Sequence, residues 1–574
     1  MRILAIGDPF WGDAGHLSLY QSTQGYEVRT AGPGGAVDHV FGADETAAAF
    51  LSRLAPEWQP DVVYCSFPEM YPPPLEIEHC PVTTVAAISD WNIYGPQLEY
   101  NLSRFDAVLS DLPATRRLKL FGARPQFLFP LYSHRTHIHR FLDRPRGIDV
   151  LFLGNLNHAI HRKRGQVLEH VAKRSEGLNV VIDAGLPPEE YALRLNDAKI
   201  ALNYGVRGEM NLRSFEAPAC GALLFVEEDN AEVFDWLEPW VHCIPYSLEN
   251  VEARIRHWLA DDEARERVAE AGRQRVLQLA AERRLDALFH WMGAVPRGER
   301  AFTTLDPRQR ALQDALLYGS SADAGQQAHS RATLHSLRAA YPEDGEILTA
   351  CGCSAYDHAK ALGNAPAQRE VRRALVRESI EAFDAASRAL PGEAVPLLNL
   401  ATLARQAGAA AERTYLERAV TATQSSLGGY LLGRVSDPFY AAWRLALGLG
   451  EAQPELLRAA AHTRLAELFL AARAPAEAHD HAEAARALAP EIATAYTLGG
   501  RAAQQAGDLA GAEALLRAGL PLTSFDVAHR QALLEVLRAR GDAAAAQALA
   551  DESARIFGVC PPLSAYVPIF ASGQ

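Results

Sequence analysis

The sequence of 574 residues predicts two α/β domains, each built on a parallel sheet, followed by an all-α region. Three observations predict this order. Short apolar runs rich in Val, Ile and Leu alternate with helix-length segments up to about residue 295. From residue 305 onward the pattern is almost purely helical, and no lysine follows Lys360. Small residues recur at a regular spacing near the C-terminus.

The strand-like runs form two sets, separated by a predicted hinge at residues 131–147. The first set comprises RILAI (2–6), DVVYC (61–65), VTTVAAI (82–88), DAVLS (106–110) and QFLF (126–129). The second comprises DVLFLG (149–154), LNVVID (178–183), KIALN (199–203) and ALLFV (222–226). Buried strands separated by helices form parallel sheets with right-handed crossovers. Each set therefore predicts one doubly wound, Rossmann-like domain, the first at 1–135 and the second at 136–295.

Three helices are expected after the last strand, at 249–260, 263–280 and 282–292. No strand follows any of them, so they are expected to close the second domain and to cross back to the first. The stretch AVPRGERAFTTLDP (294–307) is the expected linker to the helical region.

The helical region contains a repeat. Arg473, Gly507 and Gly541 are 34 residues apart, since 507 − 473 = 541 − 507 = 34. Small residues follow five and twelve positions later in each copy: Ala478, Ala512 and Ala546, then Ala485, Gly519 and Ser553. A 34-residue period of paired helices is the tetratricopeptide (TPR) signature. We expect a TPR-like solenoid at 305–560, whose concave surface suits an extended partner. A generic Ala-rich helical bundle is the alternative.

Composition excludes several classes of protein. The 56 basic and 70 acidic residues give a net charge of −14, whereas proteins that bind nucleic-acid polymers need a dense basic surface. Seven cysteines without regular spacing do not form a disulfide framework. No apolar run is long enough for a signal peptide or a transmembrane helix. The sequence therefore predicts a cytoplasmic protein.

The segment NYGVRGEMNLRSFEAPACGALLFVEE (203–228) has the strongest functional pattern. It follows a strand-like run, and its polar loop leads into a short helix that ends at Gly221. The free N–H groups at a helix N-terminus suit a phosphate. The candidate binding residues are Glu209, Asn211, Arg213, Ser214 and Glu216. A capping box with a solvated Glu–Arg pair explains the same pattern equally well.

The pattern R-x-F-E-A-x-A-C-G before an apolar strand resembles the nucleotide-sugar loop of glycosyltransferases with the GT-B fold. It is most similar to family 4 and to the spore-maturation CgeB-like glycosyltransferases. In this family the Glu of the motif binds the donor ribose, which implies that role for Glu216. Family 4 has a second Glu eight positions earlier, where this chain has Gly208, and Glu209 is the nearest acid. CgeB-like members often carry Asn-x-Arg, which Asn211 to Arg213 match.

The resemblance also implies roles for residues that follow the first strand of the second domain. Asn155 lies in the strand-to-helix turn, where its amide can meet the donor. Arg162, Lys163 and Arg164 open the next helix and would neutralise a diphosphate leaving group. A solvated basic face of the helix is the alternative.

The first strand of the first domain is followed by GDPFWGDAGH (7–16). This Gly-rich turn resembles the GT-B loop that approaches the donor phosphate and the acceptor, which implies a donor contact at Gly12. His16 and Asp13 are candidate catalytic bases, because a base must reach the acceptor hydroxyl with a suitable pKa. A histidine at the start of a helix is more often structural.

A third candidate base is Asp90 in the sequence ISDW (88–91), which also follows a strand. Relatives carry a similar acid–aromatic pair at this place, so Asp90 and Trp91 are expected to line the acceptor side. A helix N-cap beside a packed aromatic residue is the alternative.

No metal is expected. The histidines at 134, 137, 139, 158 and 161 have spacings that zinc accepts, but no Cys ligands or HExxH pattern accompany them. GT-B transfer normally uses helix dipoles and basic side chains. The sequence also lacks the GxxxxGK[ST] loop and the GxGxxG pattern, which argues against a P-loop ATPase and a dehydrogenase.

These patterns and the resemblance together predict a GT-B glycosyltransferase that takes its sugar from a nucleotide diphosphate sugar. The fused repeats favour a protein or peptide acceptor. One alternative is a polysaccharide or lipid-linked acceptor, with the repeats used for homodimerisation or for docking a partner. Another is a non-catalytic TPR scaffold with a relic transferase domain.

Overall fold

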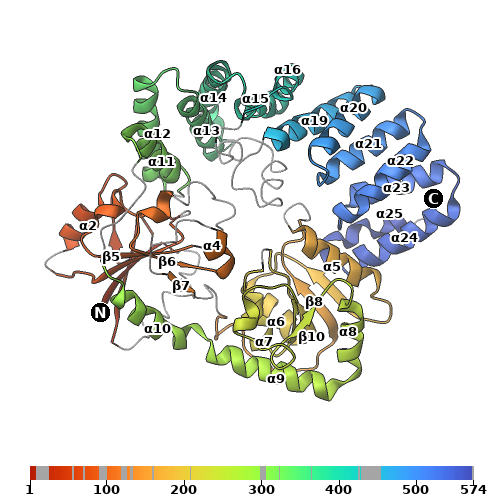
Figure 1. Cartoon of the computed structure of the whole chain (residues 1–574), viewed down its shortest axis with the longest axis horizontal. Helices are drawn as coiled ribbons and strands as arrows, with labels where there is room; N and C mark the ends of the chain where they lie inside the picture. Colours follow the sequence, from red (N-terminus) through yellow and green to blue (C-terminus); the bar gives the residue numbers. More distant parts are fainter. Residues whose placement is uncertain are drawn as a thin grey trace.

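The computed structural model contains two parallel sheets and a long helical array (Figure 1). It describes residues 1–7, 25–35, 37–54, 57–68, 71–88, 100–117, 126–128, 134–157, 161–206, 208–297, 305–321, 323–363, 365–424, 427 and 454–571.

Domain 1 is a parallel sheet in the order β3-β2-β1-β4-β5-β6-β7. Its strands are β1 (Arg2–Ile6), β2 (Glu27–Gly32), β3 (His39–Val40), β4 (Val62–Ser66), β5 (Thr83–Ala87), β6 (Ala107–Ser110) and β7 (Gln126–Leu128). Among its helices are α2 (Ala47–Leu54), η1 (Ile77–His79) and α4 (Leu112–Arg117). The central strands are fully buried, which confirms the expected doubly wound arrangement. The sequence did not predict β2 and β3.

Domain 2 is a second parallel sheet in the order β12-β11-β10-β8-β9. Its strands are β8 (Ile148–Leu153), β9 (Val180–Asp183), β10 (Ala198–Leu202), β11 (Leu223–Glu227) and β12 (Ile244–Tyr246). The helices are α5 (Arg162–Lys173), α6 (Pro188–Asp197), α7 (Arg213–Ala219), η3 (Val233–Asp235), α8 (Val251–Ala260), α9 (Asp262–Gln278) and α10 (Ala281–Ala294). The sequence did not predict β12.

Helix α10 leaves domain 2 and packs on domain 1, as the sequence predicted (Figure 1). Its Leu288, Phe289 and Met292 share one buried core with Ile3 and Val62 of the first sheet. The two domains are therefore joined twice, by the crossover between β7 and β8 and by α10.

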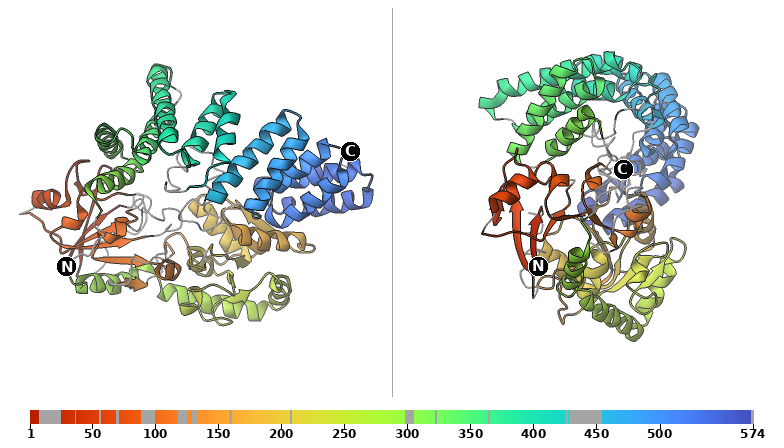
Figure 2. Two further views of the ribbon diagram at one scale, coloured as in Figure 1. Left: turned by 45° about the horizontal axis from the view of Figure 1, so that its top comes forward. Right: turned by 60° about the vertical axis from the view of Figure 1, so that its left-hand side comes forward.

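The array consists of helices in succession. They are α11 (Pro307–Gly319), α12 (Ala324–Ala340), α13 (Gly345–Ala361), η4 (Pro366–Gln368), α14 (Arg369–Ala389), α15 (Val395–Gln406), α16 (Ala411–Ala419), α19 (Pro454–Ala471), α20 (Pro475–Leu488), α21 (Ala493–Gln505), α22 (Leu509–Gly519), η5 (Leu520–Leu522), α23 (Val527–Ala539), α24 (Ala543–Gly558), η6 (Pro561–Tyr566) and α25 (Val567–Ala571). Figure 2 shows them as an arch that begins beside domain 1 and ends against domain 2.

The 34-residue spacing corresponds to the turns between paired helices. Arg473, Gly507 and Gly541 have φ values of 57°, 85° and 73° and connect α19 to α20, α21 to α22 and α23 to α24. Gly is the residue that adopts this left-handed conformation at least cost. The small residues five positions later, Ala478 and Ala512, have no exposed surface. The repeat is thus a series of helix pairs with the same turn.

The first helices of the array bind domain 1 through buried charges. Arg104 is 2% exposed and donates to Glu78 at 2.7 Å and to Asp314 of α11 at 2.8 Å. Arg310 of α11 pairs with the same Glu78. Tyr318 also donates its hydroxyl proton to the carbonyl oxygen of Pro73 at 3.1 Å.

The last helices of the array share a hydrophobic core with domain 2. Phe525 and Phe557 belong to the same buried cluster as Phe152 and Val167 of that domain. Arg530 of α23 pairs with Glu169 of α5 and, at 3.0 Å, with Glu552 of α24. The array is therefore attached to both sheet domains, and its C-terminal end completes the core of domain 2.

Candidate functional site

The strand order of domain 2 places a crevice at the carboxyl ends of β8 and β10. The chain runs from β8 to β9 on one side and then to β10 on the other. Such a switch point is where doubly wound sheets bind ligands. Gly154 and Asn155 leave β8 here, and Asn203, Tyr204 and Gly205 leave β10. We call this place the switch-point crevice.

Arg213, the first residue of α7, crosses the switch-point crevice. Its guanidinium donates to the carbonyl oxygen of Leu153 and, at 3.1 Å, to Oδ1 of Asn203. It also lies 4.4 Å from the ring centroid of Phe152. A Cβ at Gly154 would meet this guanidinium at 2.6 Å, so the glycine leaves room for it. The structure thus places a buried cation at the switch point of the second sheet.

Arg164 is a second buried cation at the same place. It donates to the carbonyl oxygen of Tyr204 at 2.8 Å and lies 5.6 Å from the Phe152 ring centroid. Burial and the nearby Arg213 lower the pKa of Arg164 to about 10. Arg164 therefore remains charged at neutral pH, and the two neighbouring guanidiniums favour an anion between or beside them.

Arg162 and Lys163 lie apart from Arg164. Arg162 donates to the carbonyl oxygen of Glu491 in the array at 2.8 Å, and Lys163 is mostly exposed, 3.8 Å from Asp229. Consecutive residues of a helix point about 100° apart. The three basic residues predicted as one cluster therefore face three different surroundings.

Glu216 lies in the first turn of α7, beside Arg213. Its Oε1 lies 3.5 Å from Nε2 of His139, and the Tyr191 hydroxyl is close enough to interact with the same carboxyl. Burial raises the pKa of Glu216, whereas Tyr191, Arg213 and Arg135 act in the opposite direction. The sequence predicted Glu216 and Arg213, gave no sign of Tyr191, and singled out His139 only in a histidine run that was considered for zinc.

Most of the other predicted loop residues form hydrogen bonds within the protein. Ser214 has no exposed surface, and its Oγ accepts a hydrogen bond from Asn203 at 3.3 Å. Glu209 Oε1 accepts the backbone N–H of Val206 at 2.9 Å. The buried Oδ1 of Asn211 has no hydrogen-bond partner among the described residues. The Asn155 side chain accepts the N–H of Asn157 at 2.9 Å and so shapes the turn after β8.

Two buried acids near the crevice were not predicted. Glu227, the last residue of β11, accepts the N–H of Gly205 at 2.7 Å, and burial raises its pKa to about 8. Glu232 accepts the N–H of Met210 at 2.8 Å, and burial, together with the nearby Asp111 of domain 1, raises its pKa to about 7. Glu232 therefore lies near the segment that follows β6 of the first sheet. Acidic residues are common in sequences of this kind, so the sequence does not single out these two glutamates. Their burial in the structure does.

The predicted residues of domain 1 lie outside the described residues: Gly12, Asp13, His16, Asp90 and Trp91. The starts of both loops are described. In the first sheet the chain adds β2 and β3 on one side of β1 and then β4 on the other side. The loop after Ile6 therefore begins at the switch point of domain 1. Gly7 has a φ of 86°, and a Cβ there would meet the carbonyl oxygen of Ser66 at 2.4 Å.

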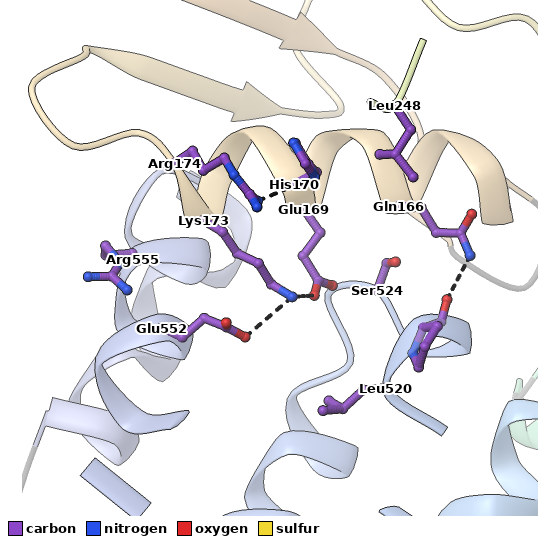
Figure 3. Close-up of a pocket in the computed structure, with 11 residues that line it drawn as sticks. Gln166, Glu169, His170, Lys173, Arg174, Leu248, Leu520, Ser524, Glu552 and Arg555 are labelled. Carbon is purple, nitrogen blue, oxygen red and sulfur yellow. Dashed lines mark hydrogen bonds and ion pairs between the residues drawn. The ribbon is translucent and has the colours of Figure 1, made fainter. Parts of the chain in front are cut away.

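A cavity of about 720 Å³ lies elsewhere, between α5 and the array (Figure 3). Its lining residues are Gln166, Glu169, His170, Lys173, Arg174, Leu248, Leu520, Pro521, Ser524, Glu552 and Arg555. Lys173 bridges Glu169 and Glu552 at 3.0 and 3.3 Å, and Arg530 pairs with the same two carboxylates, so these four charges balance. The cavity lies at the junction between domain 2 and the array.

The described part of the chain was also searched for metal sites and membrane spans. It holds no group of three or more His, Cys, Asp or Glu side chains placed to bind a metal ion. None of its helices combines the length and apolar character that crossing a membrane requires.

One family model matches the region that contains the second sheet domain. Residues 135–290 match the family model described as "Glycosyl transferase-like". This range contains β8 to β12 and includes the switch-point crevice. No curated protein sequence matches the chain.

Solved structures similar to this chain are distant. The sucrose-phosphate synthase of Thermosynechococcus elongatus is 12% identical with a TM-score of 0.37, over 52% of this chain and 100% of that one. A pneumococcal O-GlcNAc transferase, GtfA, solved with UDP and GlcNAc, is 13% identical with a TM-score of 0.30, over 41% and 57%. An α-glucosyltransferase solved with UDP and DNA is 11% identical with a TM-score of 0.38, over 51% and 99%.

Proposed function

We propose that this protein is a GT-B glycosyltransferase that moves a sugar from a nucleotide diphosphate sugar to an acceptor. The observation that carries the proposal is the switch-point crevice, where the buried Arg213 neighbours both Arg164 and Glu216 within the region that matches the glycosyltransferase model. Buried guanidiniums suit a diphosphate, and a carboxylate suits the two hydroxyls of a ribose.

The proposed chemistry needs no metal ion. As the sugar leaves, negative charge develops on the diphosphate, and the two arginines stabilise it without reorganisation because protein contacts already fix them. Asp13, His16 and Asp90 remain the proposed candidates for the base that accepts the proton of the acceptor hydroxyl. Their loops start at the carboxyl edge of the first sheet, after β1 and β5.

We propose further that the array selects a protein or peptide acceptor. The array contacts both sheet domains close to their carboxyl edges. Tyr318 and Gln326 bind the carbonyl oxygens of Pro73 and Pro72, in the segment after β4, and Glu491 binds Arg162 at the start of α5. An extended segment bound along the array would thus lie near the crevice. Polysaccharide and lipid-linked acceptors are the alternatives.

The donor role is tested by calorimetric titration of the full chain with UDP, GDP and ADP and their glucose and N-acetylglucosamine forms. We expect one nucleotide to bind, and Glu216→Gln to weaken it about 10- to 100-fold, since a charge-assisted hydrogen bond contributes about 1.5–3 kcal/mol. Glu228→Gln is the control, because Glu228 is an exposed carboxylate of the same segment. An unchanged affinity in Glu216→Gln would refute the ribose role.

The acceptor role is tested by incubating the protein with its donor and three acceptor classes: unfolded peptides, oligosaccharides and lipid-linked sugars. Intact-mass analysis should show a sugar added to peptides. Transfer only to an oligosaccharide or lipid acceptor would reject the protein-acceptor proposal and leave the donor role standing.

A further inference from the structure

Glu216 is surrounded by side chains from three separate segments. Tyr191 comes from the first turn of α6, Arg213 from α7 itself, and His139 and Arg135 from the crossover between the two sheet domains. Each reaches the carboxylate from a different direction. These contacts are more specific than a solvated Glu–Arg pair requires.

The Tyr191 hydroxyl joins the two residues of the donor site. It lies close enough to the carboxylate of Glu216 and to the guanidinium of Arg213 to interact with both. An arginine can only donate and a carboxylate can only accept. A hydroxyl between them can accept from Arg213 and turn its proton toward Glu216, which favours the observed position of the carboxylate.

His139 presents a proton to the same carboxylate. Its Nδ1 accepts the backbone N–H of Arg135 at 3.2 Å, so in the neutral ring the proton is on Nε2, which faces Oε1 of Glu216 at 3.5 Å. Burial and the neighbouring His134, Arg135 and His137 lower the pKa of His139 to about 3. The ring is thus neutral at physiological pH and also packs edge-on against Tyr191, with 6.0 Å between ring centroids.

We infer that Tyr191 and His139 are positioning residues that hold the carboxylate of Glu216 for the ribose hydroxyls of the donor nucleotide. The inference rests on the proposed function. With the His139 imidazole and the Tyr191 hydroxyl beside it, the carboxylate is restricted in orientation and offers its free lone pairs in a narrower range of directions. Because His139 belongs to the crossover, the segment that joins the two domains is also part of the donor site.

The protonation state of Glu216 provides a test that is specific to the positioning role of Tyr191. The groups that act on Glu216 or are influenced by it are Tyr191, Arg213, Arg135, His139 and Cys220. Only the ionised carboxylate accepts both ribose hydroxyls, so nucleotide affinity should rise with pH through the pKa of Glu216. The Tyr191 hydrogen bond lowers this pKa. Removing it should therefore move the midpoint of the affinity profile to higher pH.

The experiment compares Tyr191→Phe, His139→Gln and the wild-type chain by calorimetry between pH 5 and 9. The probes are the tightest binder among UDP, GDP and ADP and its 2′,3′-dideoxy form. We expect Tyr191→Phe to reduce the preference for the ribose form about three- to tenfold, which is the effect of one hydrogen bond, and to raise the pH midpoint. His139→Gln, which keeps an N–H donor, should lose less. Tyr356→Phe, which removes a hydroxyl bound to Gln406 in the array, is the control and should change neither quantity.

The two possible failures are distinct. If no nucleotide binds to the wild-type chain, the proposed function is wrong and the inference falls with it. If a nucleotide binds with a ribose preference that Glu216→Gln abolishes, while Tyr191→Phe changes neither this preference nor the pH midpoint, the positioning role alone is wrong.

Discussion

At the scale of single residues, sequence patterns identify the charged groups of the candidate site but not the buried side chains that lie beside them. Glu216 and Arg213 occur in a recognisable pattern, and the structure places them side by side. Tyr191 and His139 are 25 and 77 residues earlier in the chain, since 216 − 191 = 25 and 216 − 139 = 77. No local pattern relates such distant residues, because their contact arises only when α6 and the crossover pack against α7.

Glu227 yields a prediction for the pH dependence of stability. Burial raises its pKa to about 8, so folding favours the protonated acid. Its contribution is complete below the unfolded pKa of about 4.3 and is lost as the pH rises through about 8. Glu227→Gln keeps the shape without the charge. It should therefore flatten the fall in the free energy of unfolding between about pH 4.5 and 8, measured by urea denaturation.

The result at pH 8 distinguishes this account from a simple loss of contacts. Here the variant should be at least as stable as the wild-type chain, because the wild type must ionise a buried acid. A variant that is equally destabilised at pH 5 and pH 8 would show that Glu227 is not protonated in the folded state.

At the scale of elements, apolar content decides which strands the sequence predicts. The fully buried strands β4, β6 and β11 are short apolar runs that stand out. The edge strands β7 and β9 are apolar enough to be predicted as well. Strand β2, by contrast, carries charged and half-buried residues, β3 has two residues, and β12 contains a proline, which edge strands tolerate. The patterns of these three strands therefore resemble those of loops.

The repeat turns yield a second prediction. Arg473 has a φ of 57°, a conformation that costs a non-glycine residue about 1–2 kcal/mol. Arg473→Gly should therefore stabilise the chain by about 1 kcal/mol. Gly507→Ala and Gly541→Ala should destabilise it by a similar amount through strain alone, since a Cβ at either glycine meets nothing within 4 Å. Urea denaturation of the three variants checks the signs, and a destabilised Arg473→Gly would contradict the shared turn.

At the scale of the whole molecule, the array and the sheet domains form one connected structure (Figure 1). The sequence predicts a boundary near 294–307, and α11 does begin at Pro307. The sequence contains no pattern that predicts that α23 and α24 complete the core of domain 2, because Arg530 and Glu169 are 361 residues apart. Removing the array would expose that core, so point variants test the array's role more cleanly than truncation.

The junction of α23 with α5 yields a third prediction. Arg530→Met removes a cation that is 1% exposed and leaves Glu169 and Glu552 only partly paired. Breaking a buried pair in this way costs about 3–5 kcal/mol. Lys173→Met is the matched control, since Lys173 contacts the same two carboxylates but is 31% exposed, and it should cost at most about 1 kcal/mol. Equal losses of unfolding free energy in the two variants would show that the junction is not held by Arg530.

The central claim is that the switch-point crevice binds a nucleotide diphosphate sugar. It is tested most directly by calorimetric titration of the wild-type chain and of Glu216→Gln with UDP, GDP and ADP and their sugar conjugates at pH 8. The account predicts that one nucleotide series binds the wild-type chain and that Glu216→Gln weakens that binding about 10- to 100-fold. Absence of binding by every nucleotide, or equal affinity in both proteins, would contradict it.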